Sequence, residues 1–149
     1  MALKILELHH HAVTMPAAMT EDMGAFYRDV LGLAVDEGRW NIPGIPGFFL
    51  DLPNDVQIHL LGKDGVSMYA TAPDKDPVNV HVALAVPDIV EAEEELKRLG
   101  IDYWKLHNVA APDLQQLFFR DPAGNQIELH QIGRCRCKKS DRPAPAKKN

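Results

Sequence analysis

The sequence has little of three features that mark specialised classes of protein. It has only two cysteines, Cys135 and Cys137, and their separation by one residue suits neither a structural disulfide nor a complete zinc site. No stretch approaches the roughly 20 apolar residues of a membrane span, and no signal peptide is visible at the N-terminus. We therefore expect a reduced, cytoplasmic protein with no membrane partner.

Positive charge is also scarce outside the C-terminal residues. The chain carries 16 Lys and Arg against 21 Asp and Glu, a formal net charge of −5, which argues against a nucleic-acid partner. Residues 134–149 hold most of the local positive charge, together with prolines and alanines. We predict that they form a disordered basic tail.

What the sequence does contain is a globular composition and a repeated pattern. Its 149 residues are 46% hydrophobic and 25% charged, which suits one soluble domain with a sizeable core. Amphipathic helices are predicted at residues 19–31 and 88–99. Apolar alternation predicts strands at residues 4–15, 33–35, 47–52, 55–61, 78–86, 102–106, 115–120 and 126–132.

These elements read βαβββ twice, which is an internal repeat. Residues 1–63 form the first module, 64–77 a linker and 78–133 the second module. The predicted fold class is α+β, with the two tandem βαβββ modules forming a cupped mixed sheet around a central metal site. The spacing of corresponding residues in the two halves supports the repeat, because His59 follows His10 by 49 residues and Glu128 follows His81 by 47.

Each half of the repeat carries a ligand-type side chain on its first and last strands. Glu128 lies between Ile127 and Leu129 in a strand expected to be buried, where a carboxylate is costly unless it is paired or bound to a metal. A pseudo-twofold axis would bring four such positions together. Three imidazoles and a carboxylate suit a divalent ion, Zn, Ni, Co, Mn or Fe, so we expect a metal site made of His10, His59, His81 and Glu128.

Strand alternation leaves two assignments open. His9 and His11 should point opposite to His10, so a slip of one residue in register would exchange them. Gln57 shares a face with His59 and is an alternative second ligand or a polar neighbour of the site. His130 shares a face with Glu128 and is expected beside the ligands rather than among them.

Five motifs carry a family resemblance: residues 8–13 (LHHHAV), 26–33 (FYRDVLGL), 56–61 (VQIHLL), 81–84 (HVAL) and 118–129 (FFRDPAGNQIEL). In this order they resemble the glyoxalase, bleomycin-resistance and extradiol-dioxygenase superfamily, also called vicinal oxygen chelate (VOC), over residues 4–132. The resemblance implies one VOC domain whose metal ligands are His10, His59, His81 and Glu128. It also implies that Gln57 is the alternative ligand in an epimerase-like alignment.

The resemblance also implies an activity. A glyoxalase-I-like lyase or isomerase is expected, in which the metal chelates two adjacent oxygens of a small substrate and stabilises an enediolate while Glu128 acts as the base. Arg39, Trp40, Gln57 and Gln116 are the expected substrate-binding residues, and a homodimer is the expected assembly. Two alternatives are an Fe(II) extradiol-type dioxygenase and a non-catalytic protein that binds a drug in the cup.

Overall fold

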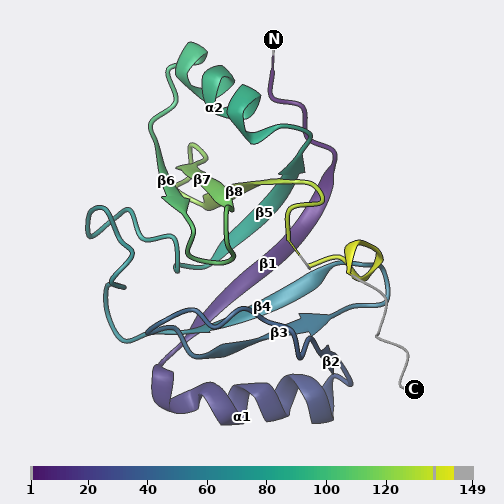
Figure 1. The fold of residues 1–149 in the computed structure, drawn as a ribbon. Coiled ribbons are helices and arrows are strands. Elements are labelled where there is room, and N and C mark those ends of the chain that lie inside the picture. The colour runs from purple at the N-terminus through teal and green to yellow at the C-terminus, as the bar shows by residue number, and fades with distance from the viewer. Residues whose placement is uncertain (1, 136, 143–149) are drawn as a thin grey trace.

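The structure is a computed structural model that describes residues 2–135 and 137–142. It contains one open eight-stranded mixed sheet with the strand order β2-β3-β4-β1-β5-β8-β7-β6 (Figure 1). The α+β class and the two βαβββ modules are confirmed. No helix within the described ranges is both long and apolar enough to cross a bilayer.

The first module fills one half of the sheet. Its strands are β1 (Glu7–Met15), β2 (Ala34–Val35), β3 (Gly47–Asp51) and β4 (Gln57–Gly62). The single predicted helix is three short segments in succession: a 3₁₀ turn η1 (Ala17–Met19), α1 (Thr20–Ala25) and a π-helical segment η2 (Phe26–Val30). β4 pairs with β1 in parallel and with β3 antiparallel.

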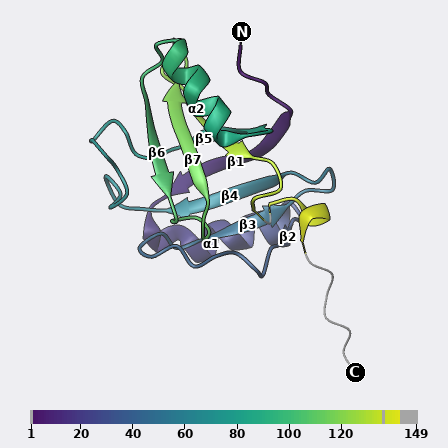
Figure 2. The same ribbon diagram turned by 45° about the horizontal axis from the view of Figure 1, so that its top comes forward.

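The second module repeats this arrangement with β5 (His81–Val86), α2 (Ile89–Arg98), β6 (Tyr103–His107), β7 (Gln115–Arg120) and β8 (Gln126–Gln131). Asp88 caps α2 by accepting hydrogen bonds from the backbone N–H groups of Val90 and Glu91. Leu96 of α2 packs on the sheet in a cluster with Leu117 and Leu129. The helices α1 and α2 lie at opposite ends of the molecule (Figures 1 and 2).

The modules join through an antiparallel pairing of β1 with β5, so β4, β1, β5 and β8 form the centre of the sheet. The register places His10 opposite Ala83, and Ala83 opposite Glu128 on the next strand. In the same way His81 lies opposite Ala12. The four predicted ligand positions consequently fall one on each central strand.

One prediction about β1 is wrong. The register between β1 and β5 shifts between Leu8 and His10, so His9 is an extra residue that interrupts the alternation of side chains. His9 and His10 are both buried, at 2% and 3% exposure, whereas His11 is exposed. The bulge thus turns two consecutive histidines into the interior, which strict alternation forbids.

The prediction of a disordered tail from residue 134 also differs from the structure. After β8 the chain turns at Gly133, whose φ is 75°, and a short 3₁₀ turn, η3 (Lys139–Asp141), follows beside the first module (Figure 1). Arg142 pairs with Asp51 at 2.6 and 2.9 Å. Acidic groups on the sheet thus hold this basic segment, and residues 143–149 lie outside the described residues.

Candidate metal and substrate site

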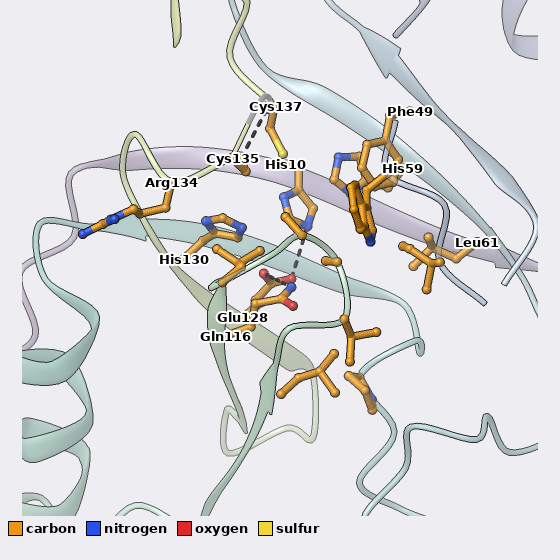
Figure 3. A pocket seen from close by; sticks show the side chains of 18 of the residues that line it. His10, Phe49, His59, Leu61, Gln116, Glu128, His130, Arg134, Cys135 and Cys137 are labelled. Atoms are coloured by element: carbon orange, nitrogen blue, oxygen red, sulfur yellow. Dashed lines mark hydrogen bonds and ion pairs between the residues drawn. The ribbon is translucent and has the colours of Figure 1, made fainter. Parts of the chain in front are cut away.

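Three of the four predicted ligands converge at the centre of the sheet. Nε2 of His10 lies 3.2 Å and Nε2 of His81 lies 2.9 Å from Oε2 of Glu128, and the two Nε2 atoms are 3.4 Å apart. All three side chains are buried and belong to one chain. Figure 3 shows His10 and Glu128 pointing toward each other, with a dashed line for their ion pair.

These separations fit a shared metal ion. With metal–ligand bonds of about 2.0–2.2 Å, two ligand atoms of one tetrahedral or octahedral ion lie about 2.8–3.6 Å apart. The three distances of 2.9, 3.2 and 3.4 Å fall in this range. Three donors leave further coordination positions open for a substrate or water, as in catalytic rather than structural metal sites.

The hydrogen bonding of His81 strengthens the fit. Its Nδ1 lies 2.6 Å from the backbone oxygen of Asn79, and because a carbonyl only accepts, Nδ1 carries the hydrogen. In the neutral ring, Nε2 then presents a lone pair to the Glu128 carboxylate. Two acceptors this close need a cation between them, either a proton or a metal ion.

Burial and the neighbouring groups together set the protonation of His10 and Glu128. It lowers the pKa of His10 from 6.5 to about 4, although Glu128 partly opposes the shift. Burial alone would raise the pKa of Glu128, but the adjacent His10 and His81 hold it well below its usual value. At pH 7 the site therefore offers a neutral imidazole and a carboxylate, which are the ligand forms a metal requires.

Gln116 orients the carboxylate from the other side. Its Nε2 donates to Oε1 of Glu128 at 2.8 Å, which leaves Oε2 for the histidines. Oε1 of Gln116 is buried and has no hydrogen-bond partner within the described residues. Gln116 lines the cavity, so this acceptor is a candidate for a hydrogen bond from a substrate hydroxyl or a water molecule once the side chain turns toward the cavity.

His59 stands apart from the three converging groups. Its ring stacks between Phe49 and His10, with centroid distances of 3.5 and 3.9 Å, and its Nε2 lies 2.8 Å from Oε1 of Gln57. Gln57 Nε2 donates to Asp36 and Asp51. Oε1 of Gln57 therefore accepts from His59, and the lone pair of His59 is on Nδ1.

The predicted substrate residues have different surroundings. Gln116 and Trp40 line the cavity described below, whereas Gln57 is fully buried and, like Arg39, is absent from that lining. Arg39 donates to the backbone oxygen of Ile45 at 2.8 Å and lies over the ring of Phe49. Burial lowers the pKa of Arg39. In this structure Arg39 and Gln57 support the wall from behind.

A cavity of about 380 Å³ opens onto the converging ligands. That volume suits a small molecule. Its walls are mostly apolar side chains from both modules and from the segment between them: Trp40, Ile42, Ile45, Phe49, Leu61, Tyr69, Val78, Leu106, Val109, Leu114 and Phe118.

Two residues that sequence reasoning set aside also line this cavity. Cys135 and Cys137 come from the segment after β8, and Cys137 is buried at 5% exposure. Figure 3 shows both on the opposite side of His10 from Glu128. The only signal in the sequence was the Cys-x-Cys spacing close behind the last strand, which does not say where the chain turns.

Comparisons with known proteins agree with this architecture. A glyoxalase-like domain family matches residues 12–130. No curated protein matches the sequence significantly. A methylmalonyl-CoA epimerase from Mycobacterium tuberculosis superposes with a TM-score of 0.65 at 23% identity, over 88% of this chain and 91% of that one.

Two further solved structures are similar at comparable levels. A hypothetical protein from Bacillus halodurans C-125 has a TM-score of 0.62 at 20% identity, over 84% of this chain and 93% of that one. A Streptomyces coelicolor methylmalonyl-CoA epimerase variant in complex with 2-nitronate-propionyl-CoA has a TM-score of 0.63 at 15% identity, over 86% and 95%. The chain belongs to the glyoxalase-like domain family of the vicinal oxygen chelate superfamily.

Proposed function

We propose that this chain is a metal-dependent enzyme of the lyase or isomerase type, in which His10, His81 and Glu128 hold one divalent ion. The observation that carries the proposal is the meeting of two imidazole Nε2 atoms at one carboxylate oxygen, at 3.2 and 2.9 Å, in a buried site beside a cavity. A divalent ion there supplies Lewis-acid polarisation to a substrate with two adjacent oxygens.

The protein's own groups supply the remaining chemistry. Glu128 is the proposed base: its carboxylate would leave the ion to take the substrate proton, while Gln116 keeps its hydrogen bond to Oε1. Oε1 of Gln116 would accept a hydrogen bond from the substrate. The apolar walls hold the substrate body and keep bulk water from the proton that moves, which strengthens each electrostatic contact.

A second candidate is favoured by the position of His59. Two histidines and one carboxylate with open positions are the ligand set of non-haem Fe(II) oxygenases. Because Nε2 of His59 is bound to Gln57, the fourth predicted ligand is not in the cluster. A dioxygenase acting on a catechol therefore remains the alternative that the same geometry supports.

Two assays on one protein separate these candidates. Protein loaded with Ni²⁺, Co²⁺ or Zn²⁺ is incubated in D₂O with methylmalonyl-CoA or with the hemithioacetal of methylglyoxal and glutathione, and deuterium incorporation is followed. Protein loaded with Fe²⁺ is given catechol, and oxygen uptake is followed. Isomerisation with deuterium exchange, abolished in Glu128→Gln, would support the lyase or isomerase. Oxygen uptake alone would favour the dioxygenase, and folded, metal-loaded protein that does neither would point to a binding protein.

A further inference from the structure

The bulge in β1 gives His9 a position that the carboxylate site does not use. Its ring stacks on His130 with centroids 4.2 Å apart, and its Nε2 lies 3.2 Å from Sγ of Cys135. His9 is 2% exposed. One nitrogen of a buried imidazole is therefore directed at a sulfur that comes from the far end of the chain.

The segment carrying that sulfur is held at several points. Lys138 pairs with Glu7 at 2.9 Å, and the backbone N–H of Lys139 and the hydroxyl of Ser140 donate to the carboxylate of Asp55 at 2.6 Å each. Arg142 pairs with Asp51. These hydrogen bonds and ion pairs join residues 138–142 to strands or turns of the first module. The approach of the cysteines to His9 is therefore part of the fold.

Both cysteines take part in the cluster. The backbone N–H of Cys137 donates to Sγ of Cys135 at 3.2 Å, and the ligand atoms of His9, Cys135 and Cys137 all lie within 4.8 Å of one another. A zinc ion with Zn–S bonds of about 2.3 Å and Zn–N bonds of about 2.0 Å separates its sulfur and nitrogen ligands by about 3.5 Å. The observed group needs only a small adjustment to reach that arrangement.

We propose that His9, Cys135 and Cys137 form a second metal site, for a thiophilic ion such as Zn²⁺, Cd²⁺ or Cu⁺. Two sulfurs and an imidazole without a carboxylate select soft ions, whereas the carboxylate site suits harder ones. The bound ion would fasten the C-terminal segment over the cavity and fix one of its walls. The proposal does not depend on the activity proposed for the carboxylate site.

Cys137 lies between the two clusters. Its sulfur also groups with His10 and His59, so a serine at Cys137 alone could affect both sites. The variant that tests the second site by itself is therefore Cys135→Ser, because Cys135 groups only with His9 and Cys137 among the described residues. Cys135→Ser with Cys137→Ser removes every thiol, because the chain has no other cysteine.

The test is a Cd²⁺ titration of untagged, reduced, full-length protein, followed by sulfur-to-cadmium charge-transfer absorption in the ultraviolet. We expect a saturable band at one Cd²⁺ per chain that persists in Glu128→Gln. His9→Ala should weaken Cd²⁺ binding about tenfold or more, while His11→Ala, the exposed neighbour, should leave it unchanged. Circular dichroism and thermal melting of each variant establish that it is folded.

Two results would overturn the proposal. One is a folded parent that develops no thiolate band with Cd²⁺. The other is equal Cd²⁺ affinity in parent and His9→Ala, which would leave the cysteines as thiols without an imidazole ligand. If Glu128→Gln loses the metal of the carboxylate site but keeps the thiolate band, the substitution has removed the carboxylate site alone. Failure of the carboxylate site can therefore be told apart from failure of the thiolate site.

Discussion

Nδ1 of His9 and Nδ1 of His10 lie 2.8 Å apart, which places one hydrogen between two neighbouring rings. The opposite nitrogen of His10 faces Glu128, and that of His9 faces Cys135. If His10 binds a metal through Nε2, its Nδ1 keeps the hydrogen and donates it, so His9 must carry its own hydrogen on Nε2. Neutral rings cannot both present a lone pair outward while this bond is kept.

The first prediction is that metals at the two sites oppose each other. A saturating amount of Mn²⁺, which prefers the carboxylate site, should weaken Cd²⁺ binding at the thiolate band by about 5- to 100-fold, a usual range for coupled sites. The Glu128→Gln variant is the control and should show no effect of Mn²⁺. Identical Cd²⁺ affinity in the parent with and without Mn²⁺ would show that the shared hydrogen does not couple the sites.

The second prediction concerns the support of His59. Gln57→Leu removes the hydrogen bonds to His59, Asp36 and Asp51 from a fully buried position. We expect the free energy of unfolding to fall by about 2–4 kcal/mol, because buried polar groups lose partners. Urea denaturation measures it. Gln115→Leu, which loses one hydrogen bond at a half-buried position, should cost about 1 kcal/mol, and an equal cost in both variants would contradict the prediction.

The third prediction is a pH dependence of stability from Glu93, far from the proposed ligands. A hydrogen bond from Tyr103 at 2.7 Å, with further bonds from Lys105 and Gln115, lowers the pKa of Glu93 from 4.5 to about 2. A folded-state pKa below the unfolded one adds stability above about pH 5, and that stability is lost as the pH falls toward 2.

Glu93→Gln should therefore lower the free energy of unfolding at pH 7 by about 1–3 kcal/mol and flatten its fall between pH 5 and 2. The measurement is urea denaturation across this range in the presence of a chelator, so that metal release does not contribute. Glu94→Gln, an exposed neighbour on α2, is the matched control. If Glu93→Gln and Glu94→Gln both show the same fall in the free energy of unfolding between pH 5 and 2 as the parent, the hydrogen bonds of Glu93 do not stabilise the fold.

The fourth prediction tests how the C-terminal segment is held. Arg142→Ala removes the paired contact with Asp51 and the 3.4 Å contact with Asp36. Losing about 1–2 kcal/mol of local stability would raise alkylation rates of Cys135 and Cys137 about 5- to 30-fold. Mass spectrometry of iodoacetamide labelling measures this, with the exposed Lys97→Ala as control. An unchanged rate would mean that the segment is held elsewhere.

Much of the fold could be predicted from the sequence, because the repeated spacing and the five motifs report local pattern. The placement of His10, His81 and Glu128 on central strands follows from the same repeat. The burial of His9 could not be predicted, since a bulge adds one residue without changing the apolar pattern around it.

The remaining differences arise from long-range contacts. The bond between Gln57 and His59 depends on Asp36 and Asp51 turning the amide, and these residues lie on other parts of the first module. Cys135 meets His9 across 126 positions of the chain. No periodicity in a basic, proline-containing segment indicates that acidic groups on the sheet will hold it.

The most direct test of the carboxylate site is metal content by elemental mass spectrometry, in untagged protein that also carries Cys135→Ser and Cys137→Ser so that thiolate binding does not contribute. We expect about one divalent ion per chain after reloading with Co²⁺ or Ni²⁺, lost when His81→Ala or Glu128→Ala is added and retained with His59→Ala. Folded protein that takes up no divalent ion, or that keeps it in the His81→Ala and Glu128→Ala variants, would contradict the account.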